Sequence, residues 1–69
     1  MAADIRILTT FTRDRILRAA EAAFAGSGYN AVRLADIAGQ VGITRPSLLY
    51  HVNSKEQLYT AVIERSFTA

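Results

Sequence analysis

Two segments with the apolar spacing of a helix are separated by only three residues, and this short separation limits the folds open to the chain. In residues 32–41 the apolar side chains recur at intervals of three and four: Leu34, Ile37, Ala38 and Val41. Gly42 supplies the backbone freedom that ends this helix, and Ile43 is the single apolar residue of the turn. A turn this short keeps the two helices in contact and directs Ile43 into the core.

The residue after Ile43 starts the next helix. The hydroxyl of Thr44 can cap the free amides of the first turn, and Pro46 is tolerated there because those amides have no acceptor within the helix. We expect a helix of about two turns from Arg45 to about His51, with Leu48 and Val52 facing inward. Two short helices joined by a turn that contains glycine form a helix-turn-helix unit.

A longer helix is predicted before this pair. Its apolar residues lie on one helical face: Ile16, Leu17, Ala20, Ala23 and Phe24. Gly26 and Gly28 are expected to end it, and Tyr29 to follow as an apolar plug with a polar tip. Three arginines of this helix are expected to form a solvated face: Arg13, Arg15 and Arg18.

The start of this helix is predicted near Thr12, which is a plausible N-cap, with Phe11 placed to pack onto Ile16. Residues 1–11 are then an N-terminal arm that forms either a short extra turn or a mobile segment. Residues 12–69 form the helix-turn-helix domain.

Ser54 and Gln57 have the spacing of a capping box, which predicts the start of a fourth helix. The apolar arc of this helix is broad: Leu58, Tyr59, Ala61, Val62 and Ile63. Such an arc predicts contact with something outside a small bundle, and no signal stops the helix near residue 69, so we expect the chain to be part of a longer protein. No segment alternates apolar and polar residues as a strand does. The predicted class is all-α: a small bundle of three helices with a helix-turn-helix, plus a fourth C-terminal helix.

The chemistry of the side chains excludes several functions. The chain has no cysteine and a single histidine, His51, so it offers neither a disulfide framework nor a metal cage. Its few carboxylates show no paired arrangement, so we expect no catalytic residues, no cofactor and no enzyme activity. Asp4 and Arg6 interrupt the first apolar residues, and no apolar run could span a membrane, so we expect a cytoplasmic protein without a membrane partner.

Charge and topology together favour nucleic-acid binding. The net charge is +2 and the isoelectric point about 9.5, which is in the range of nucleic-acid-binding domains. In a helix-turn-helix unit the second helix enters the major groove and its first residues meet base edges. Those residues here are Thr44, Arg45, Pro46 and Ser47. Arg45 suits guanine or phosphate, and Ser47 can donate or accept a hydrogen bond. At the start of the fourth helix, both the ammonium of Lys55 and the helix N-terminus attract a phosphate.

The segments ILRAAEAAFAGSGY and LADIAGQVGITRPSLLYHVNSKEQLYTAV resemble the DNA-binding domain of the tetracycline-repressor (TetR) family of bacterial transcriptional regulators, from Ile16 to about Val62. The matches that are most specific in combination are Ile37-Ala38, Gly42-Ile43, Leu48, Tyr50-His51 and Ser54-Lys55-Glu56. The resemblance implies a homeodomain-like N-terminal domain of an effector-responsive repressor, acting as a homodimer on a palindromic operator in double-stranded DNA of the bacterial nucleoid.

The resemblance also implies a larger C-terminal helical domain that dimerises and binds a small-molecule effector, and we expect that domain to lie outside these 69 residues. The 69-residue chain by itself is then expected to be a weak dimer or a monomer.

For the DNA contacts, the resemblance implies base and phosphate contacts at residues 44–47 and phosphate contacts at Tyr50, His51 and Lys55. The sequence departs from the family at Leu49, where many members have a tyrosine that contacts the DNA backbone. It departs again at the start of the second helix, where Val32 and Arg33 replace the usual Thr or Ser. Two alternatives follow: Arg33 supplies a longer-range phosphate contact, or Asn30 caps the helix one turn early.

Each candidate also has a structural interpretation. Arg45, Lys55 and Arg33 could be surface charges, His51 a half-buried histidine, and Tyr50 a core aromatic. The alternative for the whole chain is a small helical protein-interaction module without DNA binding, which would use the apolar arc of the fourth helix. The third helix discriminates, because such a module has no reason to direct the first residues of that helix outward beside Lys55.

Overall fold

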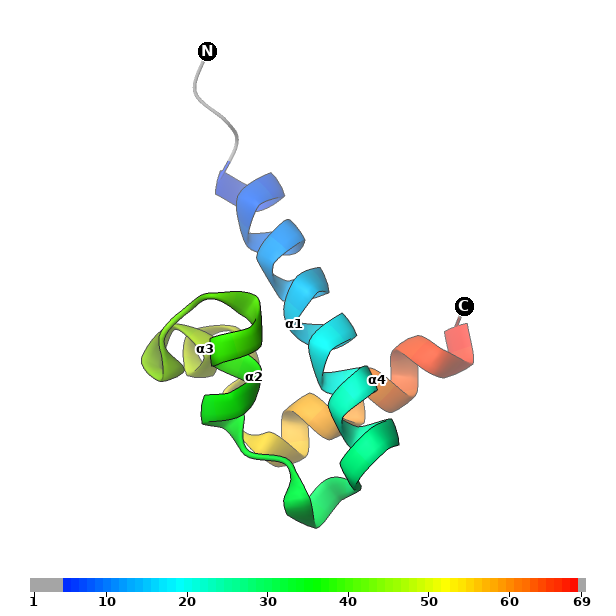
Figure 1. Cartoon of the computed structure of the whole chain (residues 1–69). Helices are drawn as coiled ribbons and strands as arrows, with labels where there is room; N and C mark the ends of the chain where they lie inside the picture. The colour runs from blue at the N-terminus through cyan, green and yellow to red at the C-terminus, as the bar shows by residue number, and fades with distance from the viewer. Residues whose placement is uncertain (1–4, 69) are drawn as a thin grey trace.

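The computed structural model describes the backbone of residues 5–68 and the side chains of residues 11–65, and this part of the chain is an all-α domain without strands (Figure 1). The elements follow in this order: α1 (Ile5–Ser27), a 3-10 turn η1 (Tyr29–Ala31), α2 (Leu34–Val41), α3 (Arg45–Val52) and α4 (Lys55–Thr68). In the view of Figure 1, α2 and α3 lie together on one side of α1, and the C-terminal end of α4 lies on the other. The predicted fold class is confirmed.

The start of α1 is earlier than predicted. The helix begins at Ile5 and crosses the boundary predicted between the arm and the domain. Neither glycine nor proline interrupts residues 5–25, so nothing in the backbone stops the helix before Thr12. Thr12 therefore lies inside the helix, and its prediction as an N-cap is wrong. Phe11 is also helical and 62% exposed, so the predicted packing of Phe11 onto Ile16 is wrong as well.

The helix ends follow the predicted glycines. α1 ends at Ser27, where the amide of Gly28, which has a φ of 83°, donates to the carbonyl of Phe24 at 2.9 Å. α2 ends at Val41, where Gly42 adopts the left-handed conformation with φ 87° and ψ 29°. Both of these helix ends are confirmed.

The start of α2 differs in detail from the prediction. Val32 precedes the helix and is buried in the core, and the N-cap is Arg33, whose side chain caps no amide. Asn30 lies within η1. The alternative in which Asn30 caps the helix one turn early is therefore wrong, because the chain turns through η1 and then runs extended before α2 begins.

Each of the four helices contributes one fully buried large side chain to a common core: Ile16, Ile37, Leu48 and Leu58. Smaller or less central residues complete it: Leu17, Ala20, Phe24, Val32, Ala38, Val41, Val52 and Val62. Burial of a side chain of this size contributes about 1.5–3 kcal/mol, so the core residues of α3 hold that helix against the other three. The inward directions predicted for Leu48 and Val52 are confirmed.

An aromatic cluster closes the end of the bundle where α1, η1 and α4 meet. The ring of Tyr29 stacks on Phe24 at a centroid distance of 5.8 Å, and the ring of Tyr59 contacts both edge-on at 5.0 Å. Tyr29 is half-buried, as expected for an apolar plug with a polar tip.

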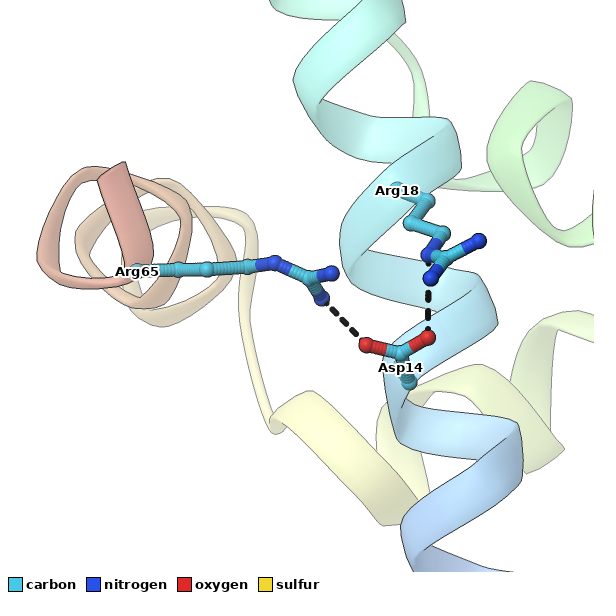
Figure 2. Close-up of polar contacts among 3 residues, drawn as sticks. All are labelled: Asp14, Arg18 and Arg65. Carbon is cyan, nitrogen blue, oxygen red and sulfur yellow. Dashed lines mark hydrogen bonds and ion pairs between the residues drawn. The ribbon is translucent and has the colours of Figure 1, made fainter. Parts of the chain in front are cut away.

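α4 is tied to α1 by polar as well as apolar contacts. Figure 2 shows the carboxylate of Asp14 on α1 between two arginines, Arg18 on the same helix and Arg65 on α4. Further along the apolar arc of α4, Tyr59 and Ile63 stay 37% and 38% exposed.

No helix among the described residues is both long and apolar enough to cross a membrane.

The start of α4 forms half of the predicted capping box. The amide of Gln57 donates to the hydroxyl of Ser54 at 3.1 Å. The side-chain oxygen of Gln57 instead accepts a hydrogen bond from the Asn53 amide at 3.1 Å, so it does not complete the reciprocal half. Asn53 follows the last residue of α3 and has a positive φ of 60°.

Candidate nucleic-acid interface

The first turn of α3 (residues 44–47) follows the Gly42 turn and is held by its own cap. Thr44 is extended, with φ −78° and ψ 159°, and its hydroxyl accepts a hydrogen bond from the Ser47 amide at 3.2 Å. Pro46 has no amide to satisfy, so it fits this first turn without cost. The predicted cap is confirmed, and it leaves the hydrogen of the Thr44 hydroxyl available for donation.

The helical phase of α3 decides which of its side chains reach the surface. Leu48 and Val52 are buried one turn apart, and Tyr50, on the opposite side of the helix, is 80% exposed. Thr44, Arg45 and Pro46 are also exposed. The exposure of Tyr50 excludes its interpretation as a core aromatic.

One flank of α3 carries Ser47 and His51, which are one turn apart and both half-buried. The His51 ring lies edge-on to the Tyr50 ring at a centroid distance of 5.4 Å. Leu49 lies on the other flank with Arg45, and it is half-buried too. The two aromatic rings therefore continue the exposed surface of the first turn towards the C-terminal end of α3.

Lys55 is the first residue of α4, and its side chain lies on the aromatic cluster. The Lys55 Nζ atom is 4.5 Å from the centroid of the Tyr29 ring, which is a cation–π distance. The side chain is half-buried, so Lys55 is more than a solvated surface charge. The sequence contains no local signal for this contact, because Tyr29 and Lys55 lie on different elements.

Arg33 stands apart from the other candidates. It is exposed at the N-terminus of α2, where it lines an open depression together with residues of α1 and α2, Ala23 and Gln40 among them. No described hydrogen bond, ion pair or ring contact joins it to α3 or to Lys55. The structure thus brings together residues 44–47, Tyr50 and His51 on α3, places Lys55 at the next helix start, and leaves Arg33 on α2.

The charges of this surface are largely uncompensated. Within the described part of the chain, the ion pairs involve Asp14 with Arg18 and with Arg65. Arg33 and Arg45 have no carboxylate partner there, and Lys55 contacts a neutral ring. Exposed cations without internal partners can bind anions without first breaking an ion pair.

Arg15 is exposed, as expected for the solvated face of α1, but it also makes a contact that the sequence does not predict. Its guanidinium Nη2 donates a hydrogen bond to the carbonyl of Val41, the last residue of α2, at 2.8 Å. The two residues are 26 positions apart, so no local pattern could have predicted the contact. Arg15 thereby connects the middle of α1 to the end of α2, directly before the turn that leads to α3.

Comparison with known proteins places residues 16–62 within the model of one family, described as bacterial regulatory proteins, tetR family. Over 53 residues the chain is 40% identical to the HTH-type transcriptional activator FasR of Mycolicibacterium smegmatis and 42% identical to the HTH-type transcriptional regulator TtgR of Pseudomonas putida. Each match covers 77% of this chain, and 24% and 25% of those proteins respectively.

A third relative, the HTH-type transcriptional repressor KstR2 of Mycolicibacterium smegmatis, is 38% identical over 63 residues, which is 91% of this chain and 31% of that protein. The chain therefore spans about a quarter to a third of the length of these curated relatives. No solved structure gives a significant match.

Proposed function

Because the chain belongs to the tetR family of bacterial regulatory proteins, we propose that it is the DNA-binding head of a transcriptional regulator and that α3 enters the major groove. One observation carries the proposal: the first turn of α3 is capped and cationic, and residues 44–46 are exposed, on a helix whose opposite face is buried. In helix-turn-helix units the residues at this position meet base edges.

Within the first turn of α3, Arg45 is the proposed base reader, because its fork of donors matches the acceptors of guanine in the major groove. Ser47 reads a neighbouring base edge or binds a phosphate. The oxygen of Thr44 already accepts the Ser47 amide, so its hydroxyl contacts DNA as a donor, and a phosphate is the acceptor it would meet. Pro46 adds apolar contact with the groove.

The proposed phosphate contacts lie on either side of this turn. Tyr50 and His51 extend the exposed surface of α3, and Lys55 adds its ammonium to the positive end of α4. Arg33 reaches a phosphate further along the duplex from the start of α2. These contacts fix the orientation of α3 in the groove and carry little sequence information themselves.

We further propose that the regulator acts as a dimer on a palindromic operator. Two heads on one face of the duplex require half-sites about 34 Å apart, or a multiple of that distance. An effector that changes the separation of the heads would break this register and release the DNA. Relatives of similar identity are named an activator in one case and a repressor in another. We propose repression, because a dimer on its operator excludes other proteins from the same DNA without any further contact.

A second candidate is a protein-interaction module that binds through α4. Tyr59 and Ile63 favour it, because both keep more than a third of their surface exposed on the outer part of the apolar arc. Contact of α4 with another protein surface is also compatible with DNA binding through α3.

The experiment is NMR mapping of the isotopically labelled chain titrated with a short mixed-sequence duplex at low salt. The proposal expects amide shifts centred on Arg33, residues 44–47, Tyr50 and Lys55, and expects them to shrink as salt rises because phosphate contacts release counterions. The absence of shifts, or concentration-dependent shifts confined to residues 58–67, would instead support the interaction module.

A further inference from the structure

We propose that Arg15 is a positioning residue for DNA recognition: its guanidinium holds the turn between α2 and α3, and so sets where the first turn of α3 lies. The inference rests on the proposed function, since it assigns a role in DNA binding to a residue of α1. It does not require Arg15 to contact DNA.

The bond of Arg15 falls at the end of a helix where carbonyls lack partners. The last four carbonyls of a helix have no amide within the helix from which they could accept a hydrogen bond. At the end of α2 the amides of Gly42 and Ile43 both donate to the same carbonyl, that of Ala38, at 2.9 and 3.0 Å. The carbonyl of Val41 accepts instead from Arg15 at 2.8 Å. A cation at this end of a helix also complements the negative end of the helix dipole.

Arg15 is anchored firmly on its own side. It precedes Ile16 and Leu17, which are both buried in the core, so its backbone cannot shift without disturbing the packing of α1. The hydrogen bond itself is partly buried, although much of the Arg15 side chain is exposed. The Val41 carbonyl is thus tied to a part of α1 that buried side chains hold in place.

The position of α3 depends on this turn as well as on direct packing. Only Gly42, Ile43 and Thr44 separate Val41 from the first residue of α3. α1 packs mainly against α2 and α4 and less against α3, and α3 itself buries only Leu48 and Val52. A short helix that is held only by two buried side chains can rotate about them. The direction of the α3 axis therefore also depends on where the turn from Val41 is held.

A direct phosphate contact is the competing role for Arg15. A guanidinium has five donors, and one nitrogen bonded to Val41 leaves others available. The two roles differ in their salt dependence. A phosphate contact contributes about one unit to the slope of log affinity against log salt, and a positioning contact contributes none.

The test compares Arg15→Gln and Arg15→Lys with Arg13→Gln. Arg13 is an exposed arginine on the same helix with no described bond to α2, so it controls for loss of one positive charge. All variants are measured at a temperature at which circular dichroism shows them folded. In the absence of DNA, Arg15→Gln is expected to shift the amide resonances of residues 42–45, and Arg13→Gln is expected to leave them unchanged. Unchanged resonances in Arg15→Gln would overturn the proposal.

The second measurement uses duplexes selected by the wild-type chain from a random-sequence pool. Arg15→Gln is expected to lower affinity for the selected duplex by at least about fivefold, the effect of misplacing one base contact, while its salt slope equals that of Arg13→Gln. Arg15→Lys retains a cation that can still reach the carbonyl, so it is expected to recover most of this loss.

The outcomes separate the two proposals. If the wild-type chain enriches and binds no duplex, the proposed function fails, and the role of Arg15 in DNA recognition fails with it. If the wild type binds and Arg15→Gln behaves as Arg13→Gln, only the inference about Arg15 is overturned. A slope about one unit smaller in Arg15→Gln than in Arg13→Gln would identify a phosphate contact and would also overturn it.

Discussion

Asp14 on α1 accepts a hydrogen bond from Arg65 on α4 at 2.6 Å, across 51 residues of sequence (Figure 2). The second oxygen of the same carboxylate lies 3.0 Å from Arg18, one turn further along α1. The two arginine side chains differ in exposure, at 34% for Arg65 and 72% for Arg18. Of these two pairs, only the one with Arg65 joins two helices.

Arg65→Ala is therefore expected to destabilise the domain more than Arg18→Ala. We expect a loss of about 1 kcal/mol in the free energy of unfolding for Arg65→Ala and at most about 0.5 kcal/mol for Arg18→Ala, because an exposed pair within one helix contributes little. In a domain of this size 1 kcal/mol corresponds to roughly 4–8 °C in Tm. Urea and thermal denaturation measure both values, and equal losses for the two variants would contradict this account of Asp14.

Gly39 inside α2 and Gly42 just after its end are expected to respond in opposite directions to the same substitution. Gly42→Ala forces a side chain into the left-handed conformation and is expected to cost about 1–2 kcal/mol, although the added Cβ meets no atom within 4 Å. Gly39 lies inside the helix, and an added Cβ there also meets open space. Gly39→Ala is expected to stabilise the domain by about 0.5–1 kcal/mol through helix propensity. Chemical denaturation of the two variants gives the sign of each change in the free energy of unfolding. Destabilisation by both substitutions would contradict the open space found around Gly39.

Arg45→Ala is expected to change which sequences the domain prefers. A base reader contributes about 1–3 kcal/mol of discrimination at one position, so its loss flattens the preference there. Selection from a random duplex pool by the variant and the wild type measures the difference position by position. An unchanged preference with weaker binding would assign Arg45 to a phosphate.

Lys55→Ala is expected to weaken binding to all duplexes alike and to lower the salt slope by about one unit, because a phosphate contact carries no base information. Lys55→Arg keeps the charge and is the matched control. Affinities at several salt concentrations on selected and scrambled duplexes provide the measurement. A Lys55→Ala slope equal to that of the wild type would mean that the ammonium serves only the Tyr29 ring.

The sequence predicts those parts of this fold that depend on neighbouring residues. The spacing of Leu48 and Val52, the cap at Thr44 and the left-handed Gly42 each follow from chemistry within a few positions, and the structure confirms them. The capping box predicted at Ser54 and Gln57 forms only in part, since the Gln57 side chain accepts a hydrogen bond from Asn53. Whether the Gln57 oxygen accepts from the Asn53 side chain or from the Ser54 amide depends on the backbone conformation of Asn53, which the local sequence pattern does not fix.

The sequence does not predict contacts between helices that are distant along the chain. The bonds of Arg15 to Val41 and of Arg65 to Asp14, and the position of Lys55 over Tyr29, arise only when packing brings the elements together. Arginines on an amphipathic helix look alike in sequence whether they meet water or a carbonyl. The early start of α1 has a different cause: threonine favours N-caps, but no residue before Thr12 stops the helix, so α1 includes Thr12.

The connections between the last three helices contain three and two residues. Helical proteins dominated by such local contacts fold in microseconds to milliseconds, because little loop entropy is lost before their contacts form. A domain with this topology refolds quickly after each unfolding event. Its resistance to proteases is then set by the fraction of molecules that are open at equilibrium and not by a slow unfolding rate. Substitutions that weaken the core or the ties between helices will consequently lower the amount of the protein in the cell in step with their effect on stability.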